Sequence, residues 1–540
     1  GIYAKSGAST VELSNQIKVK IKELNKSLPD GLKLEIAFNR ATYIGAAIEE
    51  VYKSLVIASV LLMPYSIFSA EGNEEEASSS IFDEVVVTAR NREEAAQSVP
   101  IPITALGAAQ LDARNITEIK DIEKLTPNMQ FDAQGINATV TNVFLRGIGQ
   151  TNWSATQDPK IGIYVDGVYL SRAQGGLVDL MDIERVEVLR GPQGTLFGRN
   201  TTAGLVHIIT KAPSDEMEGM LNVGIGTANH QVMRGTLNVP LTDRLSARFA
   251  VMTKETDGFI TNIANGNKHG NEDSRSLRAS LNFDADNYDA RFTYDHFEAN
   301  ELAMLGSCRF NLNKNGALVG GFPALANFFG TYDSMVANCE ATSQDYALDN
   351  NPNQSASSAT DSYTLTQNFD LSFADLTVIS NHREIDNFNG TWGWNMGNGP
   401  HLSRAGNSNL LDVINNPSKH DIDSHEIRFS GDTGNLSWTF GAYIFEEDSV
   451  DSIDVPIFRG VTTPTPAEWP LFYLVLPGLN VAETVLGTQA FGSRTQSNIV
   501  TNSNDAIFAE GTYAIDDQTD LTGGGRRSND DREFTRIQTN

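Results

Sequence analysis

The chain has 540 residues, too many for one ordinary domain, so at least two domains are expected. Its formal net charge of −28 argues against a nucleic-acid partner, because surfaces that bind nucleic acids are basic. No uninterrupted run of about 18 apolar residues occurs, so the sequence predicts no membrane-spanning helix.

Residues 1–52 form a separate N-terminal segment. Its pattern predicts a helix over Thr10–Leu28, a turn at Pro29-Asp30-Gly31 and a strand over Leu32–Phe38. The stretch GASTVELSNQIKVKIKELNKSLPDGLKLEIAFNRATYIGAAIEEVYKSLVIAS resembles the periplasmic porter region of resistance–nodulation–division efflux pumps. We expect a pump-like fragment joined to a different protein, and we assign it no function.

Residues 53–70 have the pattern of a secretory signal. Their apolar core, LVIASVLLM, is too short to span a membrane, and Lys53 precedes it. Phe68-Ser69-Ala70 offers a cleavage point, although Phe68 is large for that position. Residues 71–97 begin with EGNEEEASSS, an acidic and serine-rich composition that predicts a flexible linker.

Residues 98–212 predict a small α+β domain. Apolar residues at three-residue spacing predict a short amphipathic helix; these residues are Ile116, Ile119, Ile122 and Leu125. Asn115 is the expected cap of this helix, and Glu118 completes the capping box. Asp166-Gly167 lies between two apolar segments, and Asp-Gly supplies the positive φ angles of a type I′ hairpin. Strands are predicted at 101–106, 143–145, 184–189 and 205–210.

The stretch ERVEVLRGPQGTLFGRNTTAGLVHIIT, with VFLRG and YVDGVYL before it, resembles the plug domain of TonB-dependent outer-membrane receptors. The residues in the matched plug motifs are Arg146, Gly147, Asp166, Gly167, Arg190, Gly191, Pro192, Gly194, Gly198, Asn200 and Gly204. A phosphate-binding glycine loop is the alternative. It would need Gly-Lys-Ser/Thr followed by a helix, whereas Gly198 precedes Arg199-Asn200 and no helix is predicted.

The linker ends in DEVVVTA, which resembles the TonB box of the same family. The resemblance implies that TonB binds this segment, which comprises Asp83, Glu84, Val85, Val86, Val87, Thr88 and Ala89. Three consecutive valines favour an extended backbone, and an extended peptide can add as a strand to the edge of a partner's sheet. The alternative is that residues 85–87 are simply a strand of the plug.

Residues 213–540 predict a partial transmembrane β-barrel. Apolar and polar residues alternate over 221–226, 245–252, 277–284 and 436–444, as expected for strands with one face toward lipid. Short connections at 241–243, 285–287, 372–373, 431–434 and 515–518 alternate with long polar segments near 257–273, 299–361, 386–423 and 447–504. A soluble β-sandwich, the alternative, would not sort its connections so regularly. Short turns are periplasmic in such barrels, and long loops are extracellular.

This pattern yields about eleven strands, whereas bacterial barrels have even numbers. Gly523-Gly524-Gly525 also interrupts the pattern expected of the last strand. We therefore expect the C-terminal part of the barrel to be missing. A product that cannot close a barrel, and so cannot transport, is the alternative to a working receptor.

The family resemblance implies TonB-dependent transport of a scarce ligand across the outer membrane of a Gram-negative bacterium. The implied partners are TonB, outer-membrane lipid and a small-molecule ligand such as a ferric siderophore. Haem, cobalamin, glycans and plant-derived aromatics are the alternative ligands. We expect Arg146 and Arg190 to hold the plug to the barrel wall by charge pairs, because interior charges need partners. No cofactor is implied, and no Ser, Cys or His arrangement indicates an enzyme.

Two further groups carry chemistry. Cys308 and Cys339 lie in a polar segment without a Cys-x-x-Cys pair, which favours one loop disulfide over a metal or redox site. In the stretch HDIDSHE at 420–426, Asp421, Asp423 and His425 would share one face of a strand. We interpret that stretch as a solvated strand start, because nothing else in the sequence converges on it, and we predict no metal site.

Overall fold

The computed structural model describes part of the chain, which divides into the units Gly1–Asp83 and Glu84–Asn540. The described residues are 20–21, 86–88, 90, 92, 94–95, 99, 101–114, 116–132, 142–150, 155–172, 180–262, 266–302, 346–347, 355–389, 416–456, 493–516 and 519–539. Apart from Lys20 and Ile21, all of them belong to the second unit. None of the helices in these ranges is long and apolar enough to cross a membrane.

A five-stranded mixed sheet forms the centre of the first domain in this unit. Its strand order is β3 (Ile103–Gly107), β9 (Ile183–Arg190), β10 (Gly204–Thr210), β7 (Ile161–Val165) and β8 (Val168–Leu170). Strands β10 and β7 are parallel, and the other neighbours are antiparallel. The core of the domain includes Val186, Val188, Val206 and Ile208, none of which is more than marginally exposed. The expected strands are confirmed.

Small elements complete this domain. They are β1 (Val86–Val87), β2 (Glu94–Ala95), helix α3 (Ala108–Ala113), the 3₁₀ helix η1 (Ile119–Lys124), β4 (Met129–Asp132), β5 (Asn142–Leu145) and β6 (Ile148–Gly149).

The predicted short helix is present as the 3₁₀ helix η1, but its predicted start is wrong: η1 begins after Glu118, whose side chain makes no cap hydrogen bond. The Glu118 carboxylate instead forms ion pairs with Lys120 and Lys254. Ile116, Ile119 and Ile122 are buried in the core as expected, and Asn115 lies outside the described residues.

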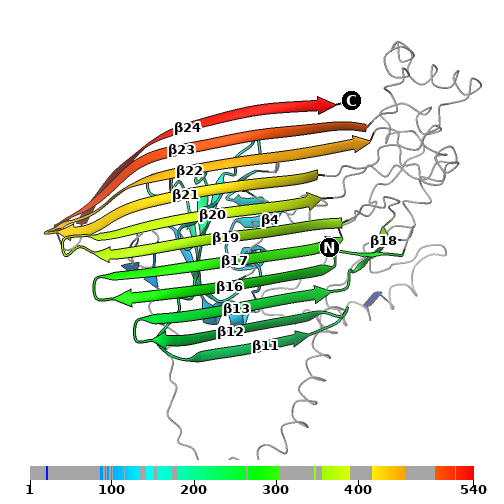
Figure 1. Cartoon of the computed structure of the whole chain (residues 1–540), viewed down its shortest axis with the longest axis horizontal. Coiled ribbons are helices and arrows are strands. Elements are labelled where there is room, and N and C mark those ends of the chain that lie inside the picture. Colours follow the sequence, from blue (N-terminus) through cyan, green and yellow to red (C-terminus); the bar gives the residue numbers. More distant parts are fainter. Residues whose placement is uncertain are drawn as a thin grey trace, which may run out of the picture. The chain divides into compact units, whose positions relative to one another are not determined.

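An eleven-stranded antiparallel sheet forms the rest of the unit, and its strands follow one another in chain order (Figure 1). The strands are β11 (Glu218–Ile225), β12 (Gln231–Thr242), β13 (Leu245–Thr256), β16 (Glu272–Ala285), β17 (Tyr288–Leu302), β19 (Ser355–Asp370), β20 (Asp375–Asn389), β21 (Asn416–Thr433), β22 (Leu436–Pro456), β23 (Ser493–Asp516) and β24 (Thr519–Thr539). Within the described residues, β11 and β24 are each paired on one side only, so the sheet is open.

A third group, β14 (Ile260–Asn262), β15 (Lys268–His269) and β18 (Tyr346–Ala347), forms a small separate sheet.

The two faces of the large sheet differ as the alternation predicts. On what we call the inner face, the residues that contact the plug are mostly polar and buried, for example Arg248 and Lys254. On the outer face, apolar side chains are exposed, including Phe249, Leu281, Phe292, Phe440 and Ile444. Apolar exposed residues in alternation with buried polar ones are the pattern of a lipid-facing barrel wall.

Two expectations about the strands are wrong. β19, β21, β22 and β23 have 16, 18, 21 and 24 residues, so they extend into segments predicted to be long loops. The ends of these strands carry polar residues on both faces. A search for alternating apolar and polar residues therefore does not detect these ends. The doubtful last strand is also present, because the glycines 523–525 still pair with residues 509–511 of β23. The short turns lie where they were expected.

Candidate functional site

The start of the unit is an extended segment docked on the plug. Val86 and Val87 pair with Ala95 and Glu94, so β1 and β2 form a two-stranded antiparallel ladder. The side chain of Val87 is completely buried and packs in a cluster with Tyr164, Leu189 and other residues. Of the expected TonB-binding residues, only Val86, Val87 and Thr88 are described; Asp83, Glu84, Val85 and Ala89 lie outside the described residues.

A buried carboxylate holds the end of this segment. The backbone N–H of Thr88 donates to Oε1 of Glu187 at 2.8 Å, and its hydroxyl donates to the same oxygen at 3.2 Å. Glu187 lies on β9 and is 0% exposed. Arg185, two residues away on the same strand, donates through Nε to this oxygen at 2.9 Å. Hydrogen bonds to an ionised group are stronger than neutral ones, so Glu187 acts as a latch on Thr88.

His207 connects this latch to the Asp166-Gly167 hairpin. Its Nε2 accepts a hydrogen bond from the backbone N–H of Gly167 at 3.2 Å, which places the ring proton on Nδ1, 3.5 Å from the Thr88 hydroxyl. Burial lowers the pKa of His207, which keeps the imidazole neutral. Asp166, at the other side of the hairpin tip, lies 3.9 Å from Arg291 of the large sheet. The hairpin therefore contacts both the sheet and the residue that touches the docked segment.

The docked segment lies at the end of the sheet that has the short turns. Arg92 Nη2 lies 2.9 Å from Asp432, one residue before the β21 strand end, and Arg90 donates to Thr512 near the end of β23 at 3.0 Å. The short turns of membrane barrels face the periplasm. The segment that resembles a TonB box is thus placed at the end expected to meet a periplasmic partner.

The plug-motif residues are arranged by backbone requirements as much as by side chains. Positive φ angles occur at Arg146, Gly147, Asp166, Gly167, Gly191, Gly198, Asn200 and Gly204, and the pair at 166 and 167 confirms the expected hairpin turn. Gly204 has a φ of +143°, and a Cβ there would lie 2.2 Å from the carbonyl oxygen of Leu189. Pro192 and Gly194 lie in the loop between β9 and β10. Asn200 also donates to the Tyr169 hydroxyl at 2.8 Å.

The expected contacts of Arg146 and Arg190 with the wall are not what the structure shows. Arg190 donates to Thr104 within the plug at 2.8 Å, and the exposed Arg146 occupies a turn. Other residues make plug–sheet ion pairs, among them Asp182 with Arg248, Glu118 with Lys254, Asp166 with Arg291, Arg172 with Glu447 and Asp158 with Arg532. Motif membership did not reveal these pairs, because each wall partner lies at least 66 residues away in sequence.

The Arg172–Glu447 pair is the most deeply buried of these contacts. The side chains are 2% and 1% exposed, and both Nε and Nη2 of the guanidinium donate to the two carboxylate oxygens. Nη1 donates to the carbonyl oxygen of Ala155 at 3.1 Å, and Asn502 donates to Glu447 at 3.3 Å. A two-pronged pair of this kind fixes both position and orientation. It holds the plug strand end at β8 against β22.

Glu118 makes the corresponding contact on β13. Its carboxylate lies 2.6 Å from Lys254 and 2.5 Å from Lys120. Burial alone would raise the pKa of Glu118, but the ammonium groups of Lys254 and Lys120 outweigh burial and lower the pKa to about 2. The carboxylate is therefore ionised throughout the physiological pH range.

This pKa predicts how plug docking depends on pH. A carboxyl group whose pKa is lower in the folded state stabilises that state above its unfolded pKa, near 4.5, and loses the effect as pH falls through about 2. A shift of this size corresponds to about 3 kcal/mol. We expect the free energy of plug opening, measured by hydrogen exchange, to fall between pH 4.5 and 2 by about this much more in the wild type than in Glu118→Gln. Equal pH dependence in the two proteins would contradict the assignment.

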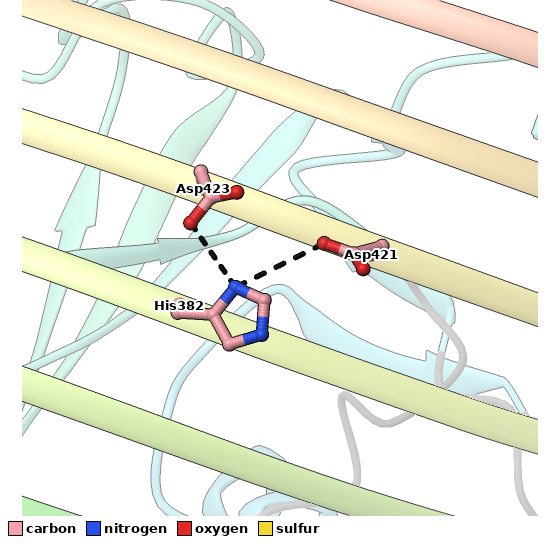
Figure 2. A group of neighbouring side chains, drawn as sticks. All are labelled: His382, Asp421 and Asp423. Carbon is pink, nitrogen blue, oxygen red and sulfur yellow. Dashed lines mark hydrogen bonds and ion pairs between the residues drawn. The ribbon is translucent and has the colours of Figure 1, made fainter.

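The stretch at 420–426 divides between the two faces of the sheet, as its alternation predicts. His420 is buried on the inner face, whereas Asp421, Asp423 and His425 lie on the outer face. His382 of β20 lies beside the two aspartates (Figure 2). The sequence did not predict that His382 lies beside the two aspartates. The connection between β20 and β21 is long, so the sequence does not define which of their residues lie opposite each other. Cys308 and Cys339, the expected disulfide, lie outside the described residues.

Two family models match the chain. The TonB-dependent receptor plug domain matches residues 95–205, and the AcrB/AcrD/AcrF family matches residues 1–64. Both resemblances expected from the sequence are confirmed. The match to the plug model includes all eleven plug-motif residues and the mixed sheet up to the start of β10.

Curated relatives extend the similarity beyond the plug. The pesticin receptor of Yersinia pestis is 24% identical over 478 residues, which cover 87% of this chain and 58% of the relative. The vitamin B12 transporter BtuB of Vibrio vulnificus is 29% identical over 206 residues, or 38% of this chain and 33% of the relative. The chain thus spans little more than half the length of the pesticin receptor.

Solved structures share the fold of the plug and the sheet. The ferric yersiniabactin uptake receptor FyuA from Yersinia pestis superposes with a TM-score of 0.61 at 17% identity, covering 81% of this chain and 60% of FyuA. FpvA of P. aeruginosa bound to heterologous pyoverdines superposes with a TM-score of 0.60 at 14% identity, covering 84% of this chain and 55% of FpvA. Residues 95–205 are therefore a TonB-dependent receptor plug domain, and the chain is related to the TonB-dependent receptors through its plug and its large antiparallel sheet.

Proposed function

We propose that this chain serves TonB-dependent uptake of a scarce ligand across the outer membrane of a Gram-negative bacterium. The observation that carries the proposal is the docked segment at Val86–Thr88, a valine-rich extended strand at the short-turn end of the sheet. A strand of this kind can add to the edge of a partner's sheet once it is released. TonB is the proposed partner, with Asp83–Ala89 as its binding segment.

The ligand we propose is a ferric siderophore. The support is the similarity in fold to FyuA and FpvA, whose names describe uptake of ferric yersiniabactin and binding of pyoverdines. The outer face, with its exposed apolar side chains, would contact membrane lipid. In this scheme the plug ion pairs keep the path closed, and a pull on the docked segment rearranges the plug. No covalent bond is made or broken.

The proposal is tested with Val86→Pro. Proline lacks the N–H that a strand donates to its neighbour, so it should prevent addition of the segment to a partner's sheet. We expect Val86→Pro to abolish uptake of radiolabelled ferric yersiniabactin by cells that express the full chain, while binding of the same ligand at the cell surface is unchanged. The control is Ser79→Pro, which places proline in the acidic linker and should leave uptake intact.

Two results would count against the proposal. If Val86→Pro cells take up the ligand as well as the wild type, the segment does not engage TonB. If cells with the wild-type chain neither bind nor take up the probe, a second probe, ferric pyoverdine, is tested in the same way. Failure of both, with the protein present in the outer-membrane fraction, would contradict ferric siderophore transport and favour the alternative of a product that cannot transport.

A further inference from the structure

A histidine and two aspartates from neighbouring strands meet on the outer face of the sheet. Nδ1 of His382, on β20, lies 3.1 Å from Oδ1 of Asp423 and 3.8 Å from Oδ1 of Asp421, both on β21 (Figure 2). One potential ligand atom from each residue lies within 4.8 Å of the others. Ligand atoms around a tetrahedral metal ion with bonds of about 2.0–2.2 Å are separated by similar distances, so a small movement would bring all three onto one ion.

The second nitrogen of the His382 ring also has a carboxylate partner. Nε2 lies 3.5 Å from Oε1 of Glu384, which belongs to the same strand and face. Histidines that bind metals almost always present their other ring N–H to a carboxylate, a carbonyl or water, which fixes the orientation of the ring. Glu384 therefore occupies the position of an orienting residue, and this contact is independent of the two aspartates.

The strand register concentrates negative charge around the same point. Asp421 lies directly opposite Glu384 on one side and Asp448 on the other, and Asp423 lies opposite Glu446. Like charges directly opposite each other across a strand pair are destabilising. The nearby ammonium of Lys419 is engaged with Asp386 at 2.7 Å. A bound cation would offset the repulsion between these paired carboxylates.

The site is open to water and has room for further ligands. Next to Asp421 a groove of about 280 Å³ is lined by side chains that include Asp361, Glu384, Lys419 and Asp448. The aromatic rings of Tyr294 and Tyr363 stack beside His382 on the same face. Rings of this kind mark the membrane–water interface of barrels. In the strand register Asp423 lies level with Tyr363 and His382, and Asp421 lies two residues nearer the long connection that precedes β21. The two aspartate side chains are 49% and 60% exposed, so an ion can reach them.

We propose that His382, Asp421 and Asp423 bind one divalent transition-metal ion such as Zn²⁺, with Glu384 orienting the imidazole and water completing the coordination. An imidazole nitrogen among the donors favours zinc, copper or nickel over calcium and magnesium, which prefer oxygen ligands only. The site lies on the outer face, away from the plug, so the inference goes beyond the proposed uptake and does not depend on it.

The test is a titration of the full chain in detergent micelles with ZnCl₂, followed by calorimetry. The chain has eight histidines, so the site is identified by difference between variants. We expect His382→Gln and Asp423→Asn each to lose one binding event per chain, and Glu384→Gln to retain it with roughly 10- to 100-fold weaker affinity. His296→Gln is the matched control, because His296 also lies on the outer face but has a single carboxylate partner, Asp361, at 2.9 Å.

A second readout distinguishes direct coordination from a change in charge. Co²⁺ in place of Zn²⁺ should give a visible absorption spectrum in the wild type and in His296→Gln, and that spectrum should be absent in His382→Gln. The proposal is overturned if the wild type shows no saturable zinc binding, or if His382→Gln binds zinc with the stoichiometry and affinity of the wild type. Circular dichroism of each variant checks that its strands are intact, and Asp423→Asn gives an independent answer if His382→Gln does not fold.

Discussion

Removal of Glu447 should detach the end of β8 in the plug from the wall. In Glu447→Ala the guanidinium of Arg172, 2% exposed, would remain buried without its carboxylate partner. Loss of one member of a buried ion pair costs about 3–5 kcal/mol, because the remaining charge has lost its compensation. We expect the free energy of local opening, measured by hydrogen exchange of plug residues 161–172 in the full chain in micelles, to fall by about this amount.

A double variant separates charge from packing. In Arg172→Met with Glu447→Leu, no charge is left buried, and well-packed apolar replacements of buried ion pairs are often neutral or stabilising. Most of the lost opening free energy should therefore return. The control is Asp386→Asn, which removes an exposed ion pair with Lys419, 59% and 73% exposed, and should cost at most about 1 kcal/mol. If the free energy of local opening falls no more in Glu447→Ala than in Asp386→Asn, the pair does not anchor the plug.

Substitution of Glu187 should release the docked segment. Glu187→Ala removes the acceptor for both the N–H and the hydroxyl of Thr88. Hydrogen bonds to a charged group contribute about 1.5–3 kcal/mol, so the amide of Thr88 should exchange roughly 10- to 100-fold faster. If release limits partner binding, the isolated periplasmic domain of TonB should bind the variant more tightly by the same factor, because a larger fraction of the protein would be competent to bind.

Glu184→Ala is the matched control for this change. Glu184 lies on the same strand and also pairs with Arg185, but it is half-exposed and does not touch Thr88. Its loss should leave the exchange rate of Thr88 unchanged. Equal rates in Glu184→Ala and Glu187→Ala would show that the ladder of β1 with β2 and the burial of Val87, rather than the carboxylate, hold the segment in place.

The contacts of the plug connect the wall of the large sheet with the docked segment. The hairpin at Asp166-Gly167 approaches Arg291 of the sheet on one side, and it donates to His207 on the other. His207 in turn lies beside Thr88. A movement of the hairpin against the wall would therefore alter the hydrogen-bond geometry at the latch. A double-mutant cycle of Asp166→Asn with Glu187→Ala measures the coupling along this route.

Local patterns by themselves determined much of the fold. The Asp-Gly pair at 166–167 specifies its hairpin, because both residues must adopt positive φ angles. Two-residue alternation identified the strands and which of their faces is apolar, and the short turns between them. Both depend on neighbouring residues only. The predicted start of the helix near Ile119 was wrong, because Glu118 contacts Lys254, 136 residues away, instead of completing a capping box.

The tertiary structure decided which charged groups meet. Strand alternation places a residue on a face, but it does not say which residue of the next strand lies opposite when a long connection intervenes. For this reason Arg172 with Glu447, and His382 with Asp421 and Asp423, were not predicted, and Arg190 was wrongly assigned to the wall. Register across such connections is set by the packing of whole strands and of the plug against the sheet, and that is a property of the folded molecule.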